Sequence, residues 1–235
     1  MIDFSSLKIC EKTKKALSSF DINFVFQPIF DRNLQLNAYE ALMRPIQMSV
    51  TELIRLKMEK NSLHEMELAT FFGAMMAFRE RNYPKTVNLH INSFPSENFT
   101  DQESLEYAEN IGINENPIVI EILEYMSAEA SVWKNKRRQA QEYKMDFALD
   151  DFGAGYSGLG SVDFYNPKII KIDRSLISNI DKSSVKQINL NKFLKLFHSQ
   201  NRLVLAEGIE TQQELDYLLK INIDLFQGYF LGMPQ

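Results

Sequence analysis

Acidic and amide side chains that could bind a divalent cation follow one apolar run after another along this chain. The clearest case is Phe147–Tyr156, in which Asp150 and Asp151 come directly after an apolar run and precede Gly153 and Gly155. Neighbouring residues on a strand point to opposite faces, so both carboxylates reach one site only where the strand has ended and its backbone bends. We expect the two glycines to supply that bend. Taken alone, the stretch is equally well interpreted as a solvated acidic turn.

The same pattern recurs at the ends of the other apolar runs. The residues concerned are Glu40, Arg44, Asn92, Glu121, Glu124, Lys171, Glu207 and Gln227. Charged residues within apolar runs are costly to bury unless they are paired or coordinate a metal. Carboxylates with one amide oxygen favour hard cations such as Mg2+ or Mn2+, and two such cations can clamp a phosphodiester. The alternative is a set of buried salt bridges around Lys171, but one lysine cannot pair with six carboxylates.

Eight strand-like runs that alternate with helical patterns must position these residues. The expected strands are 23–30, 36–44, 86–91, 118–123, 146–149, 168–172, 203–206 and 223–226. The expected helices are 5–19, two within 51–81, and 104–110, 128–143, 158–164, 184–200 and 212–220. This alternation predicts an α/β fold of the (β/α)8 barrel type, with an open doubly wound sheet as the alternative. In a barrel, the C-terminal strand ends meet at one mouth.

Composition limits the classes of protein that fit. The net charge of -5 argues against binding of polymeric nucleic acid through a basic surface. No apolar run reaches the ~18 residues that span a bilayer, and the first 20 residues lack the apolar centre of a signal peptide. We therefore expect a soluble, cytoplasmic protein without a membrane segment. Cys10 is alone, which excludes an internal disulfide and a zinc cluster of the Cys-x-x-Cys kind.

Domain organisation is expected to be simple. Neither a low-complexity stretch nor a linker rich in Pro, Gly or Ser interrupts the chain. We therefore predict one domain over residues 1–235, with 1–20 as a helical lead-in. The chain ends at Gln235, directly after the last expected strand, where a barrel would have a closing helix. A piece trimmed from a longer chain would end in this way.

In their order along the chain, these motifs resemble those of the EAL-domain cyclic-di-GMP phosphodiesterases. The matching segments are Glu40-Ala-Leu-Met-Arg44, Asn92 in Ile-Asn-Ser-Phe-Pro95, Glu121-x-x-Glu124, Asp150-Asp-Phe-Gly-Ala-Gly-Tyr156, Lys171-Ile-Asp173, Ala206-Glu-Gly-Ile-Glu210 and Gln227-Gly-Tyr-Phe-Leu-Gly. The resemblance runs from about residue 23 to the C-terminus. It implies a barrel whose first strand is antiparallel to the rest, hydrolysis of cyclic di-GMP to linear 5'-pGpG with two Mg2+ or Mn2+ ions, and a homodimer.

The resemblance also implies a role for each matching residue. Implied metal ligands are Glu40, Asn92, Glu121, Asp150, Asp151 and Glu207, with Asp151 holding or sharing the second ion. Lys171 would position the attacking water, and either Glu207 or Lys171 would accept or donate the proton in the reaction. The implied catalytic residues are these two together with Glu40 and Asp151. Substrate-binding residues would be Arg44 at a phosphate and Gln27 and Gln227 along the cleft. Glu124 would brace the loop after the fifth strand, which the dimer interface also touches.

Some positions depart from the family pattern. Leu123 stands where the family usually has Thr, Ala154 and Gly158 replace Thr and Ser, and Met233 replaces Arg. Every implied metal ligand is present, which favours an active enzyme over a cyclic-di-GMP receptor that signals through a partner. An unrelated metal-dependent barrel hydrolase is the third interpretation.

The remaining notable residues are interpreted as structural. His90, on the same strand face as Asn92, is expected to be a satisfied core histidine beside the site. Surface or helix-capping roles are expected for His64 and His198. The basic cluster Lys134, Lys136, Arg137 and Arg138 is expected to be a solvated helix face, while Trp133, Phe71 and Phe72 are expected in the core.

Overall fold

Eight strands close into a barrel in the computed structural model, which describes residues 2–111, 116–123, 128–155 and 158–235. The strands follow one another around the barrel in chain order: β1 (Ile22–Asp31), β2 (Leu36–Pro45), β3 (Asn88–Ser93), β4 (Ile118–Ile122), β5 (Asp146–Phe152), β6 (Ile169–Ile172), β7 (Leu203–Ala206) and β8 (Leu225–Phe226). β1 is antiparallel to both neighbours, β2 and β8, whereas the other adjacent strands are parallel. The predicted barrel and its reversed first strand are therefore confirmed.

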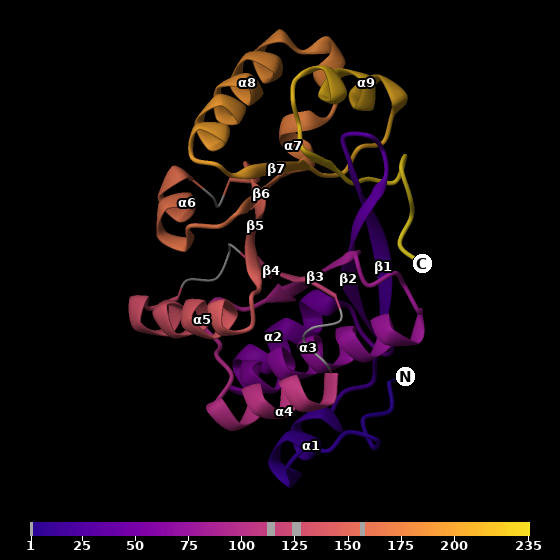
Figure 1. Ribbon diagram of the computed structural model, residues 1–235, viewed down its shortest axis with the longest axis vertical. Helices are drawn as coiled ribbons and strands as arrows, with labels where there is room; N and C mark the ends of the chain where they lie inside the picture. Colours follow the sequence, from indigo (N-terminus) through magenta and orange to yellow (C-terminus); the bar gives the residue numbers. More distant parts are fainter. Residues whose placement is uncertain (1, 112–115, 124–127, 156–157) are drawn as a thin grey trace.

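Helices pack on the outside of this barrel, except beside β1, where the C-terminal end of the chain runs (Figure 1). They are α1 (Glu11–Leu17), α2 (Val50–Glu59), α3 (Leu63–Glu80), α4 (Asp101–Ile111), α5 (Ala130–Glu142), α6 (Leu159–Tyr165), α7 (Arg174–Ile177), α8 (Ser184–Ser199) and α9 (Gln212–Lys220), with a short 3-10 helix at Ile180–Lys182. Figure 1 shows α2 to α5 on one side of the barrel and α7 to α9 on the opposite side. Among the described helices, none combines the length and the apolar character needed to cross a membrane.

Two helical features differ most from the sequence prediction. α1 begins at Glu11 and not at residue 5, because the backbone N–H groups of Lys8 and Cys10 bond to side chains of α4, namely Asn110 and Glu106, at 2.6 and 3.0 Å. α7 and the 3-10 helix that follows it were not predicted. Elements of four and three residues are too short to show a helical period in the sequence.

The barrel interior holds an apolar layer with a polar layer directly above it. The apolar layer is Ile29, Ala38, Val119, Ala148, Ile169, Leu205 and Leu225. Two positions away along each of these strands, toward the mouth at which β2 to β8 end, stand Gln27, Glu40, Glu121, Asp150, Lys171, Glu207 and Gln227. Residues two apart on a strand share one face, so both layers face the barrel axis. Strand alternation thus places these polar side chains together.

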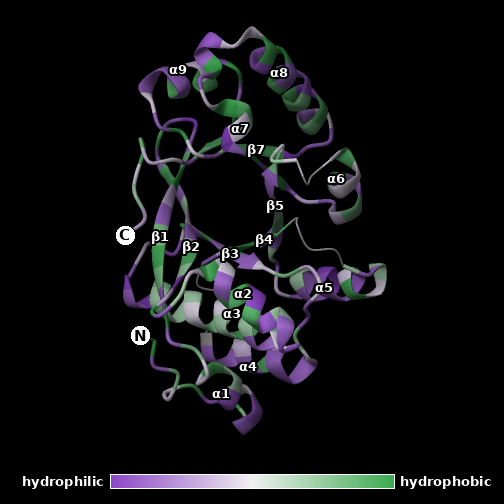
Figure 2. Cartoon of the chain, turned by 180° about the vertical axis from the view of Figure 1, so that it is seen from behind, coloured by the Kyte–Doolittle hydropathy of each residue, from purple (hydrophilic) through white to green (hydrophobic). Residues whose placement is uncertain are grey.

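The outward-facing strand residues pack against the helices in a second, larger core. Ile91 and Phe226 from strands and Phe72 and Phe197 from helices are fully buried there. Trp133 and Phe71 are also buried, as predicted. Figure 2 shows hydrophobic and hydrophilic residues alternating along strands and helices, as such a two-sided arrangement requires.

The acidic end of β5 differs from the prediction. The strand was expected to end at Leu149, but it continues to Phe152 with a shift of register between these two residues. The bend lies at Asp151 itself, whose φ of 53° is in the left-handed region, and not only at the glycines. Gly153 follows with a φ of 102°, and a Cβ there would lie 2.3 Å from a methyl group of Leu176. An irregularity inside the strand therefore turns the two neighbouring carboxylates.

Candidate active site

Lys171 lies at the centre of the polar layer, with its side chain fully buried. Its Nζ is 2.7 Å from Oδ1 of Asp150, 2.7 Å from Oε1 of Glu207, 2.8 Å from Oε2 of Glu121 and 3.7 Å from Oε2 of Glu40. These residues come from or directly follow β2, β4, β5, β6 and β7. The structure therefore brings together the catalytic lysine predicted from the sequence and four of the predicted metal ligands. The salt-bridge alternative describes part of this arrangement, because Lys171 reaches four carboxylates.

The donor set nevertheless fits divalent cations. Asp150, Asp151 and Glu207 offer carboxylate oxygens that lie within 4.8 Å of one another. Together with Glu40 and Glu121 they are five carboxylates facing one ammonium group, which leaves four uncompensated negative charges when all are ionised. Two divalent cations would balance that charge with the hard oxygen ligands they prefer.

The cluster strongly perturbs its own protonation. The pKa of Lys171 lies well above its usual value: burial opposes this, but Asp150 and the three glutamates around the ammonium outweigh it. Burial and the neighbouring carboxylates raise the pKa of Glu121 and of Glu207. Without cations, the site therefore keeps a charged lysine and retains protons on part of its acids. A lysine held in the charged form can donate hydrogen bonds but cannot accept a proton.

Two predicted amide residues fix Glu40. Asn92 donates its Nδ2 to Oε1 of Glu40 at 3.3 Å, and Gln227 donates its Nε2 to Oε2 at 2.7 Å. These contacts and Lys171 outweigh the effect of burial and lower the pKa of Glu40. Gln227 Oε1 is buried and has no hydrogen-bond partner among the described residues. Gln27 lies opposite Glu40 in the β1–β2 register and donates to the carbonyl of Gly232 at 3.2 Å.

Two cavities flank Glu40, which lines both. One, of about 340 Å³, is also lined by Arg44, Asn92 and Asp150. The other, of about 300 Å³, is lined by Gln27, Gln227 and Glu207 among others. Each is at the lower end of the volumes that hold small ligands. Arg44 is exposed, with one guanidinium nitrogen bonded to the carbonyl of Met43 at 2.9 Å, so its remaining donors face the first cavity or solvent.

The second cavity includes residues to which the sequence analysis assigned no role, and of these Arg174 lay outside the quoted motifs. Asp173, Arg174, Glu210 and Tyr229 line it. Arg174 binds the carbonyl of Gly208 and lies 2.6 Å from a carboxylate oxygen of Glu210, so it ties the loop after β6 to the loop after β7. Arg174 directly follows the Lys171-Ile-Asp173 motif, and that adjacency was the available signal.

The predicted bracing residue, Glu124, cannot be placed, but its neighbour Leu123 can. Glu124 lies outside the described residues. Leu123, which precedes it, is half-buried and lines the 340 Å³ cavity. Its backbone N–H donates to the carbonyl of Ser93 at 3.3 Å, which links the end of β4 to the end of β3.

His90 is fully buried one layer below Asn92. Its Nδ1 lies 2.7 Å from Oε1 of Glu121, while its Nε2 has no hydrogen-bond partner among the described residues. The interpretation of His90 as a satisfied core histidine is therefore wrong for one of its two nitrogens. Burial, followed by the charge of Lys171, lowers the pKa of His90 to about 3, so the ring is neutral near pH 7.

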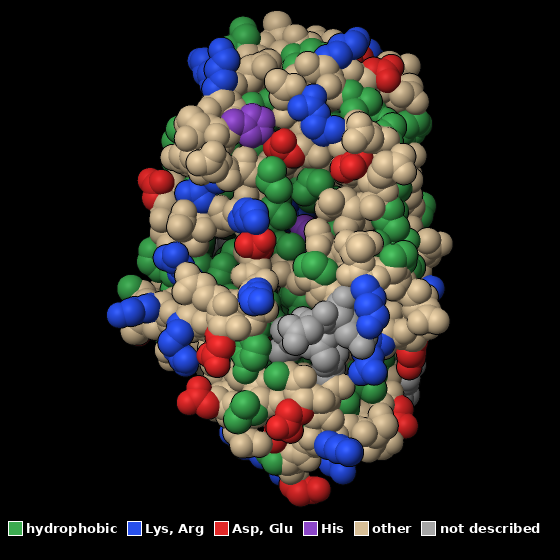
Figure 3. Space-filling model, in the orientation of Figure 1, with side chains coloured by type: hydrophobic (Ala, Val, Ile, Leu, Met, Phe, Trp, Pro, Cys, Tyr) green, Lys and Arg blue, Asp and Glu red, His purple; other side chains and the backbone are tan. Residues whose placement is uncertain are grey.

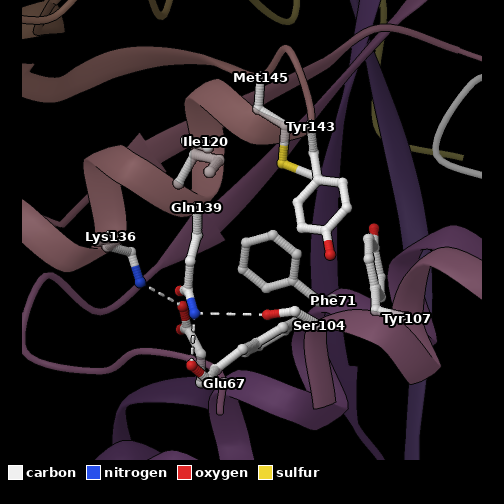
Figure 4. A pocket seen from close by; sticks show the side chains of 11 residues that line it. Glu67, Phe71, Ser104, Tyr107, Ile120, Lys136, Gln139, Tyr143 and Met145 are labelled. Carbon is white, nitrogen blue, oxygen red and sulfur yellow. Dashed lines mark hydrogen bonds and ion pairs between the residues drawn. The ribbon is translucent and has the colours of Figure 1, made fainter. Parts of the chain in front are cut away.

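A separate cavity lies outside the barrel, between β4 and helices α3, α4 and α5 (Figure 4). Its volume of about 40 Å³ suits one or a few water molecules and excludes a nucleotide base. Lys136 is buried at its edge, 2.8 Å from Glu67 Oε1, which corrects the prediction that this lysine is on a solvated face. Glu67 also accepts from the hydroxyl of Ser93 and the N–H of Phe94, at 2.6 and 3.0 Å. This buried pair therefore anchors the chain directly after Asn92.

The other predicted structural residues are near the surface. His64 and His198 are partly exposed and contact carboxylates that do not belong to the polar layer, Glu103 and Asp224 respectively. On the face shown in Figure 3, acidic and basic side chains are interspersed, and no broad basic patch is present there. This agrees with the net charge of -5.

Comparison with known proteins identifies the family. Residues 11–234 match the EAL domain. The chain belongs to the EAL domain family. Among curated relatives, the oxygen sensor protein DosP of Escherichia coli (strain K12) is 29% identical over 234 residues, which cover 94% of this chain and 29% of DosP. The cyclic di-GMP phosphodiesterase PdeF of the same organism is 35% identical over 95 residues, 40% of this chain and 13% of PdeF.

Solved EAL structures share the fold. A standalone versatile EAL protein from Vibrio cholerae O395, in its c-di-GMP bound form, superposes with a TM-score of 0.75 at 28% identity, over 92% of each chain. An EAL domain protein from Listeria monocytogenes EGD-e gives a TM-score of 0.76 at 20% identity, over 97% of this chain and 95% of that one. The likeness to the second structure concerns the fold alone. The chain spans less than a third of the length of DosP and of PdeF.

Proposed function

We propose that this chain hydrolyses cyclic di-GMP to linear 5'-pGpG, using two divalent cations, Mg2+ or Mn2+, and water as the nucleophile. The observation that carries the proposal is the convergence of five carboxylates and Lys171 at one barrel mouth, between two cavities of about 340 and 300 Å³. Cyclic di-GMP is a doubly anionic ring with a base on each side, and two cavities that meet at Glu40 suit such a ligand. Cations between carboxylates and phosphate offset their repulsion.

The positions of the polar residues support a role for each proposed metal ligand. The cations would be held by Glu40, Asn92, Glu121, Asp150, Asp151 and Glu207. When bound, such cations lower the pKa of water and stabilise the negative charge of the departing oxygen. Glu207 lines the 300 Å³ cavity beside the cluster, which suits its carboxylate to take up the proton released by the nucleophile.

The basic and amide residues would orient the reactants. Lys171 lies among the carboxylates, and its ammonium group can hold the attacking water by donating a hydrogen bond. Arg44 is exposed on the wall of the first cavity, where its planar fork can bind a phosphate through two hydrogen bonds. Gln27 and Gln227 would contact the ligand from the other side of Glu40.

A product assay tests the proposal. The purified chain is incubated with cyclic di-GMP and Mn2+ or Mg2+, and 5'-pGpG is measured by chromatography, with EDTA as the metal-free control. We expect product only with the metal, a loss of at least about 100-fold in Glu40→Gln, and no change in Glu59→Gln, a matched variant of an exposed glutamate in α2. Full activity of Glu40→Gln would contradict the assignment of Glu40.

A cyclic-di-GMP receptor is the second candidate function. The observation in its favour is that the neighbour from Vibrio cholerae was solved with c-di-GMP bound, so a cleft of this fold can hold the ligand intact. Calorimetric titration with cyclic di-GMP separates the two candidates. Tight binding of cyclic di-GMP without formation of 5'-pGpG over hours would contradict the enzyme and support the receptor.

The active form is proposed to be a homodimer. Leu159 and Phe164 of α6 are 45% and 41% exposed, close to the end of β5 that carries Asp150 and Asp151. A second copy of the chain packed on α6 would cover them and would touch the loop between β5 and α6. Sedimentation equilibrium measures the mass. A monomer at all concentrations up to about 100 μM, a range that includes typical dimer affinities, would contradict the dimer.

A further inference from the structure

One strand breaks the layering of the barrel interior. On seven strands an apolar side chain lies two positions from the residue that reaches the polar layer, as Val119 lies below Glu121 and Ala148 below Asp150. On β3 the residue two positions before Asn92 is His90. It pairs in register with Val119 of β4, a member of the apolar layer, and with Glu40 of β2, a member of the polar layer. The imidazole therefore takes the position that an apolar side chain has on the other seven strands.

Burial of that imidazole must be offset by a specific contact. His90 is fully buried, and a polar group without a partner is costly in such a place. Its contact is Glu121, likewise fully buried, with 2.7 Å between Nδ1 and Oε1. The other oxygen of Glu121, Oε2, lies 2.8 Å from Nζ of Lys171. The two oxygens of Glu121 therefore have different partners, one below the site and one in it.

The direction of this hydrogen bond follows from the chemistry of a metal ligand. A carboxylate that binds a cation is ionised and can only accept, so the imidazole must donate from Nδ1. In a neutral ring, Nε2 then carries a lone pair. A buried acceptor without a partner is tolerated more readily than a buried N–H without one, which agrees with the absence of any described partner at Nε2.

We infer that His90 is a positioning residue for Glu121: its Nδ1–H holds Oε1 below the site, so that Oε2 is the oxygen that Glu121 presents to a divalent cation. The inference rests on the proposed metal-binding role of Glu121. Outer hydrogen bonds of this kind fix the rotamer of a ligand, and their loss weakens metal affinity about 10- to 100-fold.

Two substitutions separate the donated hydrogen bond from simple packing. His90→Leu keeps a side chain of similar volume without a donor, whereas His90→Asn places an amide N–H close to the position of Nδ1. His198→Leu is the matched control, because it removes a histidine that contacts a carboxylate at 2.8 Å outside the polar layer. Mn2+ affinity is measured by electron paramagnetic resonance of the free ion, without cyclic di-GMP, and melting in EDTA checks that each variant folds.

We expect Mn2+ affinity to fall about 10- to 100-fold in His90→Leu, to stay within about threefold of wild type in His90→Asn, and to be unchanged in His198→Leu. Wild-type affinity in His90→Leu, or an equal loss in the Leu and Asn variants, would overturn the inference. Because the readout is Mn2+ binding alone, a chain that binds Mn2+ but does not cleave cyclic di-GMP would refute the proposed function and leave this inference standing.

The wild-type protein offers a test that does not depend on any variant folding. The chain has three histidines, so nitrogen-15 spectra of the imidazoles in the Mg2+-loaded protein are simple to assign. We expect His90 to be a neutral imidazole with its proton on Nδ1 and with Nε2 unprotonated. A proton on Nε2, with none on Nδ1, would overturn the inference.

Discussion

Lys171 Nζ and Asp150 Oδ1 lie 2.7 Å apart in a site where the lysine is fully buried and the aspartate is 13% exposed. In the absence of metal, this lysine is the cation around which the strand ends assemble. Glu121 and Glu207, at 2.8 and 2.7 Å from the same nitrogen, share it. The ammonium group therefore has a structural role in addition to any catalytic one, and its removal should have different effects with and without divalent cations.

Replacing the buried lysine should destabilise the metal-free protein. Lys171→Met leaves the surrounding carboxylates without their counter-charge, and loss of one partner of a buried ion pair costs about 3 to 5 kcal/mol. Mn2+ binds the folded state and supplies positive charge, so it should recover most of that loss. Urea unfolding in EDTA measures the loss of stability, and urea unfolding in saturating Mn2+ measures how much of it is recovered. An equal loss of stability in the two conditions would show that the side chain acts through packing alone.

Metal affinity should depend on pH through Asp151. Burial, followed by the neighbouring Asp150, raises the pKa of Asp151 to about 6 from 3.8. Below pH 6 a cation must displace the proton, and above it the carboxylate is already ionised, so apparent Mn2+ affinity should rise as pH increases through 6. Titrations of the protein with Mn2+ at several pH values from 5 to 8 measure this affinity. The dependence should be shallower in Asp151→Asn, and a flat profile in the wild type would contradict the prediction.

The buried pair behind Asn92 should matter for stability. Lys136→Met leaves Glu67 charged and buried against Ser93 and Phe94, and should cost about 3 to 5 kcal/mol. The double variant Glu67→Gln, Lys136→Met removes both charges and should be the more stable of the two. Lys134→Met, on the exposed side of the same helix, should change stability by less than about 0.5 kcal/mol. Urea unfolding compares them, and a double variant less stable than the single one would contradict this account.

The barrel and most of its site could be predicted because one rule governs both. Residues two positions apart on a strand share one face, so a polar residue two positions after an inward-facing apolar residue also points into the barrel. Glu121, Lys171 and Glu207 all follow this rule. The rule needs no knowledge of packing between distant elements. It failed at β5, where the register shift at Asp151 depends on the neighbouring strand β6 and the loop after it.

The rest depended on contacts that the local sequence does not encode. Lys136 was expected in solvent because its neighbours in the sequence are charged, but Glu67, 69 positions earlier, draws it into the core. Arg174 and its loop contacts could not be inferred either, since they join segments from different strands. The lack of a partner for Nε2 of His90 among the described residues is of the same kind, because it depends on what β2 and β4 place around the ring.

Gly228 should be the least replaceable glycine near the site. A Cβ there would lie 2.1 Å from the carbonyl oxygen of Ile209, a backbone atom that cannot rotate away. Gly228→Ala should therefore separate the segments after β7 and β8, cost about 1 to 3 kcal/mol, and move Gln227 away from Glu40. In Gly160→Ala, by contrast, the new methyl group meets nothing within 4 Å. The melting temperature and the turnover rate are measured for both variants, and equal effects of the two substitutions would contradict the steric account.

Stability should depend on pH through His64, which lies on α3 away from the polar layer. Its Nε2 is 3.0 Å from Glu103 Oε2 and its Nδ1 is 3.7 Å from Glu97, and Lys12 also lies 4.0 Å from Glu103. The hydrogen bond to Glu103 raises the pKa of His64 from 6.5 in spite of burial. Burial acts in the opposite direction on Glu103, but His64 and Thr100 outweigh it and lower the pKa of Glu103 to about 2.

The two shifts define a pH window. A histidine whose pKa is raised by folding stabilises the fold fully below 6.5, and this contribution is lost as pH rises through the higher folded value. A carboxyl with a lowered pKa contributes above 4.5 and loses that contribution as pH falls toward 2. The pair should therefore stabilise the protein most between about pH 4.5 and 6.5. Because the pair is partly exposed, its contribution should be at most about 1 kcal/mol.

The variant His64→Gln isolates this contribution. The difference in unfolding free energy between wild type and His64→Gln should be largest near pH 5.5 and should shrink toward pH 8.5, as the imidazolium is lost in the wild type. Lys12→Gln is the matched control, because it removes an exposed cation near the same Glu103 that stays charged throughout this range. Its effect should be nearly constant from pH 5.5 to 8.5. A difference for His64→Gln that grows with pH would reverse the sign expected from its raised pKa and refute the charged pair.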